Sequence, residues 1–451
     1  MKMKNIEVRE FEKITTHNVA HLNGIHTIPG KAFNELSAFI TDYQKTNGID
    51  EQTLFFKIGY DRQAGNYIQA RNYVGLIQLR SGYQIQILPK IDLSGDTDPS
   101  NKEMKVFLRM LRCLKELSFK AHSAADLHVT NTNLYEIFIR MFIDETHELV
   151  RHYLKSNYVN EEDNLNVFKG KLLINEHIKK NLVHKECFYV SYDDYNLNRP
   201  ENKLIKSTLL KLQRISTDYS NVRDIRQLLM SFEVIDESTN FVKDFAGVTQ
   251  HDRSMSFYEN LMLWSRVFLL GKSFTSFSGS TNAISLLFPM EKVFESYVAK
   301  LIKKNCFASI PNLDVTAQDK GYYLYDEPNK KFTLRPDIVI RSTTQNEKKP
   351  IAILDTKWKR LNNNPSINYG ISQADMYQVY AYAKKYDCND LWLLYPQTDE
   401  MKNGIISPFI SKDGVQVSVF FIDLENAENP IFEGSIAKLI TAINLLQIHE
   451  K

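Results

Sequence analysis

Alternation of apolar and polar residues predicts a β-hairpin near the start of the chain. Residues 74–79 and 83–90 form its strands, and Ser81 and Gly82 form the turn between them. The polar face carries three amides and one cation: Gln78, Arg80, Gln84 and Gln86. A DNA phosphate track would need several cations, so this face suits a protein interface better. The residues alone therefore leave two interpretations of the hairpin, a docking element for a partner protein and a solvated sheet face.

Helical periodicity dominates the chain after this hairpin. It predicts helices at 104–118, 133–157, 201–216, 221–232 and 254–270, within a middle region that is mostly helical from about 167 to 272. Helices and strands then alternate: a helix at 286–304, strands at 333–341 and 350–357, a helix at 371–386, strands at 391–396 and 415–423, and a helix at 432–447. Such alternation builds a central sheet flanked by helices. The pattern predicts an α+β multidomain protein that ends in an α/β domain with a central mixed sheet.

Two polar stretches divide the chain into three regions. Residues 160–166 are polar, and residues 273–282 are rich in Ser, Thr and Gly, which is typical of a linker. We expect a β-rich partner-docking region over residues 1–160, a helical middle region with a candidate DNA-contact surface over 161–280, and the α/β domain over 281–451.

The composition is that of an ordinary globular protein. The 451 residues are 43% hydrophobic and 24% charged, which excludes a largely disordered chain. The 56 basic and 54 acidic residues leave a net charge of +2, which excludes a histone-like polycation but allows a local basic groove. Ten lysines and arginines between Lys169 and Arg214 form either solvated helix faces or a surface for the DNA backbone.

The sequence predicts a cytoplasmic protein without membrane contact. It contains no stretch of 18 uncharged apolar residues, and its first residues lack the apolar core of a secretory signal. The four cysteines lie 74 or more residues apart, so they indicate neither a zinc ribbon nor a disulfide framework.

Two familiar motifs fail on spacing. Residues 271–273 read Gly-Lys-Ser like the end of a P-loop, but Arg266 stands where that motif needs a glycine. His147 and His152 are five residues apart, which separates them by about 140° around a helix, whereas a zinc-binding H-E-x-x-H needs a spacing of four. We therefore expect no nucleotide site and no zinc protease site.

Candidate chemistry is concentrated in residues 334–360. Asp337 follows a proline at the start of one strand, and a second strand ends in Asp355-x-Lys357. Residues i and i+2 of a strand share a face, so Asp355 and Lys357 project together, roughly 7 Å apart. If the two strands pair as a hairpin, Asp337 lies beside Asp355. Two carboxylates and a lysine suit Mg²⁺-dependent phosphodiester hydrolysis, in which the lysine orients or deprotonates the water and neutralises the transition state.

A D-x-K triplet alone more often forms a surface ion pair, but two flanking helices favour a site. The helix at 286–304 carries Glu291 and Glu295 on one face, and one of them can reach the metal. The helix at 371–386 carries Gln378 and Tyr382 on one face, where they can position the lysine, the water or a DNA phosphate. Spacing alone does not decide between the two glutamates.

The order of glutamate helix, P-D, D-x-K and Q-x-x-x-Y helix resembles the PD-(D/E)xK nuclease superfamily in its RecB-like form. More narrowly, the strings FPMEKVFESYV, RPDIVI, ILDTKWK and SQADMYQVYAYAKKY resemble the McrC nuclease subunits of McrBC modification-dependent restriction systems. A weaker likeness extends through VGLIQLRSGYQIQILPKI, FKGKLLINEHI and NLNRPENKLIK.

The resemblance implies a Mg²⁺-dependent DNA endonuclease of antiviral defence. Carried over residue by residue, it assigns catalysis to Asp337, Asp355 and Lys357 with support from Gln378 and Tyr382. It assigns metal binding to Asp337, Asp355 and Glu295, and Glu295 is preferred to Glu291 because its F-E-x-Y context fits the family.

The resemblance also implies partners. In that family the chain binds a hexameric AAA+ GTPase, stimulates its GTP hydrolysis and cuts double-stranded DNA after translocation. The partner holds the GTP and recognises modified cytosine, and complexes can dimerise through the nuclease chain.

Two other function classes stay open. A stand-alone RecB-like repair nuclease would bind DNA through residues 1–280 and would cut without partner or GTP. A GTPase-activating subunit would not need its nuclease site, although the intact D…D-x-K pattern argues against this class.

Overall fold

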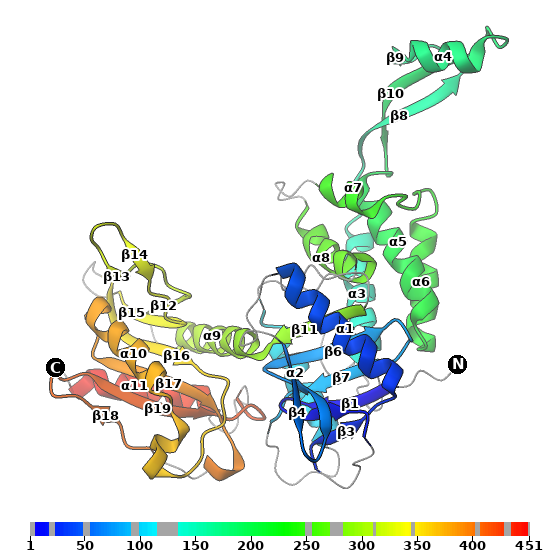
Figure 1. Ribbon diagram of the computed structural model, residues 1–451. Coiled ribbons are helices and arrows are strands. Elements are labelled where there is room, and N and C mark those ends of the chain that lie inside the picture. Colours follow the sequence, from blue (N-terminus) through cyan, green and yellow to red (C-terminus); the bar gives the residue numbers. More distant parts are fainter. Residues whose placement is uncertain are drawn as a thin grey trace.

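The computed structural model describes residues 5–17, 23–47, 55–91, 99–114, 134–248, 255–270, 283–309, 313–343, 348–401, 406–427 and 434–449. The predicted linker at 273–282 and the Gly-Lys-Ser segment at 271–273 lie outside these ranges. The described part is a mixture of helices and five sheets, which confirms the predicted α+β class (Figure 1). The division of the chain at residues 160 and 280 stays a prediction. None of the helices in these ranges has the length and apolar character needed to cross a membrane.

Two four-stranded sheets form the N-terminal part, with strand orders β1-β7-β6-β11 and β3-β2-β5-β4. Their strands are β1 (Asn5–Arg9), β2 (Lys13–Thr15), β3 (Ile25–Thr27), β4 (Phe56–Asp61), β5 (Gly65–Ala70), β6 (Tyr73–Leu79), β7 (Gln84–Leu88) and β11 (Ala283–Pro289). The helix α1 (Gly30–Asn47), which the sequence analysis did not predict, packs Leu36 and Ile40 into one core with Ile77 and Ile85.

Strands β6 and β7 confirm the predicted hairpin but not its role in docking. Leu76 and Leu88 pack into one hydrophobic core, while Ile77 and Ile85 pack into another. Gln84, which was predicted on the docking face, is completely buried. Both faces of the hairpin therefore pack against other parts of the fold and Gln84 is not accessible to a partner, while Arg80 is exposed and the docking role of the hairpin stays a prediction.

A bundle of helices forms the middle of the chain, close to the predicted ranges. Its members are α3 (Leu134–Arg151), α5 (Pro200–Ile215), α6 (Tyr219–Ser231), α7 (Phe241–Ala246) and α8 (Ser256–Leu270). The helix α2 (Pro99–Leu111) precedes them in the chain. Aromatic rings fill its centre: Trp264 of α8 stacks on Phe268 and packs against Phe138 of α3.

A long β-structured projection, residues 157–196, leaves this bundle at its top right in Figure 1 and is called the arm below. It contains β8 (Asn157–Leu165), β9 (Lys171–Leu172), α4 (Ile174–Asn181) and β10 (Phe188–Asn196). Strand β8 pairs with β10 over its whole length, about 30 Å at the usual rise per residue. The prediction of a mostly helical region from residue 167 is wrong here, because β8 buries no side chain and β10 buries only Val190, so the strands lack apolar alternation.

The basic interval from Lys169 to Arg214 divides between arm and bundle. On the bundle, Arg199 forms a buried ion pair with Glu201, at 2.8 Å between Nε and Oε2. Lys211 donates to the carbonyl of Phe268 at 2.7 Å. These two cations stabilise the bundle, so the predicted DNA-backbone surface does not extend to them.

A six-stranded mixed sheet forms the C-terminal part, in the order β12-β15-β16-β17-β19-β18. The elements are α9 (Met290–Ser309), β12 (Leu313–Ala317), β13 (Tyr323–Tyr325), β14 (Lys331–Thr333), β15 (Ile338–Ser342), β16 (Lys349–Thr356), α10 (Gln373–Tyr386), β17 (Asp390–Pro396), β18 (Phe409–Ile410), β19 (Gln416–Ile422) and α11 (Ser435–His449). Leu354 and Leu394 face the core shared with α9 and α11, whereas Ile353 and Leu393 face α10. The predicted central mixed sheet with flanking helices is confirmed.

Strand β11 joins the C-terminal part to the N-terminal sheet. It pairs antiparallel with β6, from Ala283 opposite Leu79 to Pro289 opposite Tyr73. The helix that was predicted from residue 286 therefore begins only at Met290. The backbone N–H of Met290 donates to the carbonyl of Asn72 at 2.9 Å, so the N-terminal sheet fixes the first turn of α9.

Gly75 permits the close approach of β6 and β11. Its φ is +142°, and a Cβ atom there would lie 1.9 Å from the carbonyl oxygen of Leu286. We expect Gly75→Ala to displace β11 and to lower the free energy of unfolding by about 3 kcal/mol or more, measured by denaturant titration. Gly82→Ala is the control, because its φ is +79° but nothing lies within 4 Å of the added Cβ. Equal losses in both variants would contradict this role of Gly75.

Candidate active site

The two candidate aspartates lie at neighbouring strand ends. Strands β15 and β16 are antiparallel, with Ile338 opposite Leu354, so Asp337 and Asp355 stand next to each other at one end of the pair. This confirms the predicted pairing of the two strands. Asp355 is 2% exposed and Asp337 is partly buried, so the carboxylate pair is largely shielded from solvent.

Burial and repulsion from a neighbouring carboxylate raise the pKa of each aspartate. The Oδ2 atom of Asp337 accepts hydrogen bonds from the backbone N–H and the hydroxyl of Thr356, at 2.7 and 2.6 Å. Burial and then the charge of Glu295 nevertheless raise the pKa of Asp337 to about 6. Burial and then Asp337 raise the pKa of Asp355 to about 7. Two negative charges in this position therefore call for a neighbouring cation.

Lys357 supplies one such cation. Its Nζ lies 2.6 Å from Oδ2 of Asp355 and 3.7 Å from Oδ1 of Asp375, and it donates to Oε1 of Gln378 at 3.0 Å. Burial lowers the pKa of Lys357, but the charges of Asp355 and the other carboxylates raise it by more. The net shift of the pKa is therefore upward. The side chain is therefore a charged ammonium held in a fixed position.

Helix α10 orients this lysine through a short chain of hydrogen bonds. The helix begins where the hydroxyl of Ser372 accepts from the N–H of Asp375 at 3.1 Å. One turn further on, Nε2 of Gln378 donates to the hydroxyl of Tyr382 at 2.7 Å, and that hydroxyl donates to the carbonyl of Arg335 at 3.1 Å. Tyr382 is buried behind Gln378, so it acts on Lys357 through the amide rather than directly.

Glu295 and Glu291 take different places on α9. Glu295 raises the pKa of Asp337 by its charge, and it accepts a hydrogen bond from the side chain of Gln318. Glu291 accepts from Nδ2 of Asn72 at 3.0 Å, on the side of the N-terminal sheet. The structure thus brings Glu295, rather than Glu291, towards the aspartate pair. Its approach to a metal stays a prediction.

The two aspartates, Lys357 and the glutamates of α9 line one cavity of about 870 Å³. The charged and amide side chains in its lining include Glu10, Glu291, Glu295, Asp337, Asp355, Lys357, Asp375 and Gln378. Among the described residues no cluster of three or more His, Cys, Asp or Glu is preformed as a metal cage. The donor set of Asp337 and Asp355 nevertheless fits Mg²⁺, which prefers one or two carboxylates together with waters and substrate phosphate.

Two residues of the cavity were missed by the sequence analysis. Glu10 is completely buried, and both its carboxylate oxygens accept from the indole N–H of Trp358 at 3.1 Å. Burial raises its pKa to about 7. No local signal predicts this contact, because Glu10 and Trp358 are 348 residues apart in the sequence. Asp375 had a signal, Ser372-x-x-Asp375, but that pattern predicts the start of a helix and not a site.

Fold and site together define a class, a multi-sheet α+β protein with two carboxylates and a lysine at the ends of two neighbouring interior strands of a mixed sheet. A family model described as McrBC 5-methylcytosine restriction system component matches residues 68–396, well over half of the sequence. The chain belongs to this family.

The chain is also similar to two solved structures. The fold resembles a chain of a Thermococcus gammatolerans structure, described as a refined half-complex from a tetradecameric assembly of McrB AAA+ hexamers with bound McrC. The TM-score is 0.67 at 18% identity, over 98% of this chain and 100% of that chain. A cryo-EM structure of the Thermococcus gammatolerans McrBC complex matches with a TM-score of 0.46 at 19% identity, over 67% of this chain and 88% of that one. A comparison with curated proteins gives no match.

We expect Mg²⁺ binding to weaken as the pH falls through about 7. Asp337 and Asp355 hold their protons up to about pH 6 and about pH 7, and a metal ion must displace those protons. Below this range, affinity should fall about tenfold per pH unit for each proton released. Calorimetric titration with Mg²⁺ in two buffers of different ionisation enthalpy counts the protons. Binding that does not change with pH would contradict metal binding at this pair.

Proposed function

We propose that this chain is the DNA endonuclease subunit of a GTP-dependent, modification-dependent restriction complex. In this proposal it hydrolyses phosphodiester bonds with Mg²⁺ and stimulates the GTPase of an AAA+ partner. The observation that carries the nuclease part is the convergence of Asp337, Asp355 and Lys357 in one cavity at the ends of β15 and β16. Membership of the McrBC family supports the restriction role.

The residues divide the chemistry between them. Asp337 and Asp355 would hold the Mg²⁺, which when bound polarises the scissile phosphate and lowers the pKa of a water. Thr356 fixes the orientation of Asp337 through two hydrogen bonds. The raised pKa of Lys357 favours charge stabilisation of the phosphate over a role as general base. Gln378 keeps the ammonium aimed into the cavity.

Lys357→Ala should reduce DNA cleavage by about 100-fold or more and leave Mg²⁺ binding intact, because the ammonium is not a metal ligand. Asp355→Ala should abolish both and leave partner binding unchanged. The assay is cleavage of methylated and unmethylated DNA, with and without the AAA+ partner and GTP. Lys349→Ala, at the far end of β16, is the control and should cleave normally. Normal cleavage by Asp355→Ala would refute the site, and cleavage without partner or GTP would favour a stand-alone nuclease.

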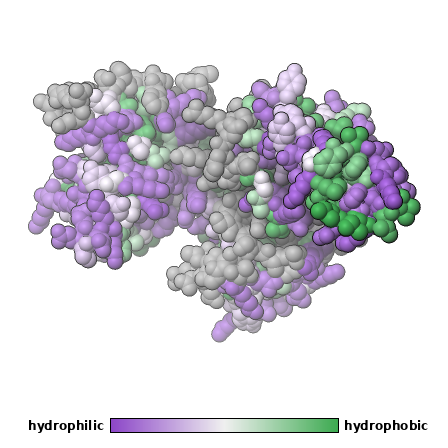
Figure 2. Space-filling view, turned by 90° about the horizontal axis from the view of Figure 1, so that it is seen from above, coloured by the Kyte–Doolittle hydropathy of each residue, from purple (hydrophilic) through white to green (hydrophobic). Residues whose placement is uncertain are grey.

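We propose the arm as the surface that docks the AAA+ partner. Ile174, Ile178 and Leu182 follow one another at intervals of four on one side of α4, and they are 62%, 58% and 75% exposed. Figure 2 looks down on the arm, and its green hydrophobic patch on the right lies over the outer end. An apolar stripe of this kind on a projecting element is typical of a protein interface. In the solved Thermococcus gammatolerans assembly, McrB AAA+ hexamers carry bound McrC.

Ile174→Asp together with Ile178→Asp should weaken binding of the AAA+ partner at least tenfold and abolish stimulation of its GTPase. Both side chains are exposed, so the melting temperature should stay unchanged. Val242→Asp is the matched control, because Val242 is 70% exposed but lies on α7, outside the arm. Calorimetry with the purified partner measures the affinity. Wild-type affinity of the double variant would remove the arm from the docking surface.

A further inference from the structure

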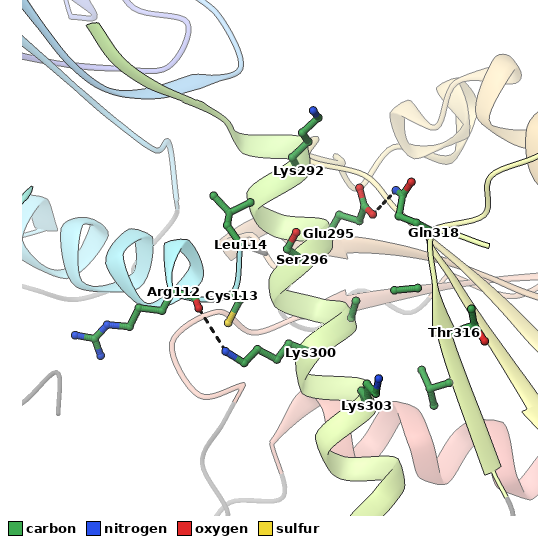
Figure 3. Close-up of a pocket in the computed structure, with 13 residues that line it drawn as sticks. Arg112, Cys113, Leu114, Lys292, Glu295, Ser296, Lys300, Lys303, Thr316 and Gln318 are labelled. Atoms are coloured by element: carbon green, nitrogen blue, oxygen red, sulfur yellow. Dashed lines mark hydrogen bonds between the residues drawn. The ribbon is translucent and has the colours of Figure 1, made fainter. Parts of the chain in front are cut away.

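A second cavity, of about 690 Å³, adjoins the candidate active site along α9. The turn that follows α2, one side of α9 and strand β12 line it (Figure 3). Lys292 and Glu295 line both this cavity and the one that holds Asp337 and Asp355. The two cavities are therefore neighbouring compartments on one helix.

The lining of the second cavity is strongly basic. Its cations are Arg112, Lys292, Lys300 and Lys303, against Glu295 as a carboxylate. Figure 3 shows the three lysines at successive levels along α9, with the side chain of Lys300 directed towards Arg112. The first and the last of them are eleven positions apart, about 16 Å of helix. A DNA strand at about 3.4 Å per nucleotide would extend over roughly five nucleotides in that distance.

The lining between the cations is apolar. Leu114, Ala299, Val315 and Ala317 contribute to it. A small hydrated anion gains nothing from such a surface, whereas a sugar–phosphate chain can place phosphates on the lysines and sugars on the apolar part. Lysine contacts to phosphates position a strand without reading its sequence. This chemistry suits a chain that cuts DNA chosen by a partner.

The border between the two cavities is the contact between Gln318 and Glu295. The backbone N–H of Gln318 also donates to the carbonyl of Asp337 at 2.8 Å. A DNA strand that passes from the basic cavity over this border therefore reaches the aspartate pair directly.

We propose that the DNA strand to be cut runs along α9, with Lys292, Lys300 and Lys303 in contact with backbone phosphates on one side of the scissile bond. This inference rests on the proposed nuclease function. Lys300 donates one bond to the carbonyl of Arg112 at 3.4 Å, and its ammonium has further donors for a phosphate.

The test compares two double variants of the full chain with equal changes of charge. Lys300→Glu with Lys303→Glu changes the basic cavity, whereas Lys304→Glu with Lys349→Glu changes exposed lysines outside it. Binding of a fluorescent DNA duplex is measured by anisotropy at several salt concentrations. The first variant should bind at least tenfold more weakly, and its plot of log affinity against log salt should lose about two units of slope. The control should bind like wild type.

Each outcome decides between explanations. Equal binding by both double variants, or an equal loss in both, would overturn the strand path and leave the nuclease proposal untouched. Loss of binding to the AAA+ partner with DNA binding intact would assign the cavity to an acidic protein segment and would also overturn it. If wild type with partner and GTP neither binds nor cuts DNA, the proposed function itself fails. Lys300→Gln with Lys303→Gln repeats the test should charge reversal impair folding, and unchanged binding by that variant would overturn the path.

Discussion

The pairing of β11 with β6 is the constraint on which the rest of the molecule depends. It brings residues 283–289 against residues 73–79, and it ends where α9 begins. Since Met290 is tied to Asn72, the first turns of α9 cannot shift without moving the N-terminal sheet. Those turns carry both glutamates and the first lysine of the basic cavity. The position of the candidate chemistry thus follows from a strand that belongs to another part of the fold.

The site itself is a compromise between burial and charge. Asp337 and Asp355 are placed where ionisation is unfavourable, and the resulting rise in pKa is opposed by Thr356 and Lys357. A protein without further function would gain by replacing such a pair with apolar side chains. The arrangement is favourable when a divalent cation binds between the aspartates and a phosphate binds near Lys357, because each ligand then meets the opposite charge.

The sequence predicted the site better than it predicted the fold around it. Asp337, Asp355, Lys357 and Gln378 meet as expected, because strand pairing and helical spacing are local rules. The arm was missed because β8 buries no side chain and β10 buries only Val190, so neither strand shows an alternation of apolar and polar residues. The start of α9 was misplaced because a short apolar run such as residues 283–289 fits a strand or a buried helix equally. Glu10 was beyond reach, since only tertiary packing brings it to Trp358.

The contact of Glu10 with Trp358 has a consequence for how such chains can be recombined. Glu10 lies just after the first strand, and Trp358 directly follows Lys357. A fragment that starts after residue 280 would keep Asp337, Asp355 and Lys357, but the indole N–H would lose its carboxylate and β11 would lose its partner strand. The C-terminal part is therefore not a transplantable module. Chimaeras between relatives should exchange residues 5–91 together with residues 283–427, so that both ends of the chain come from the same parent.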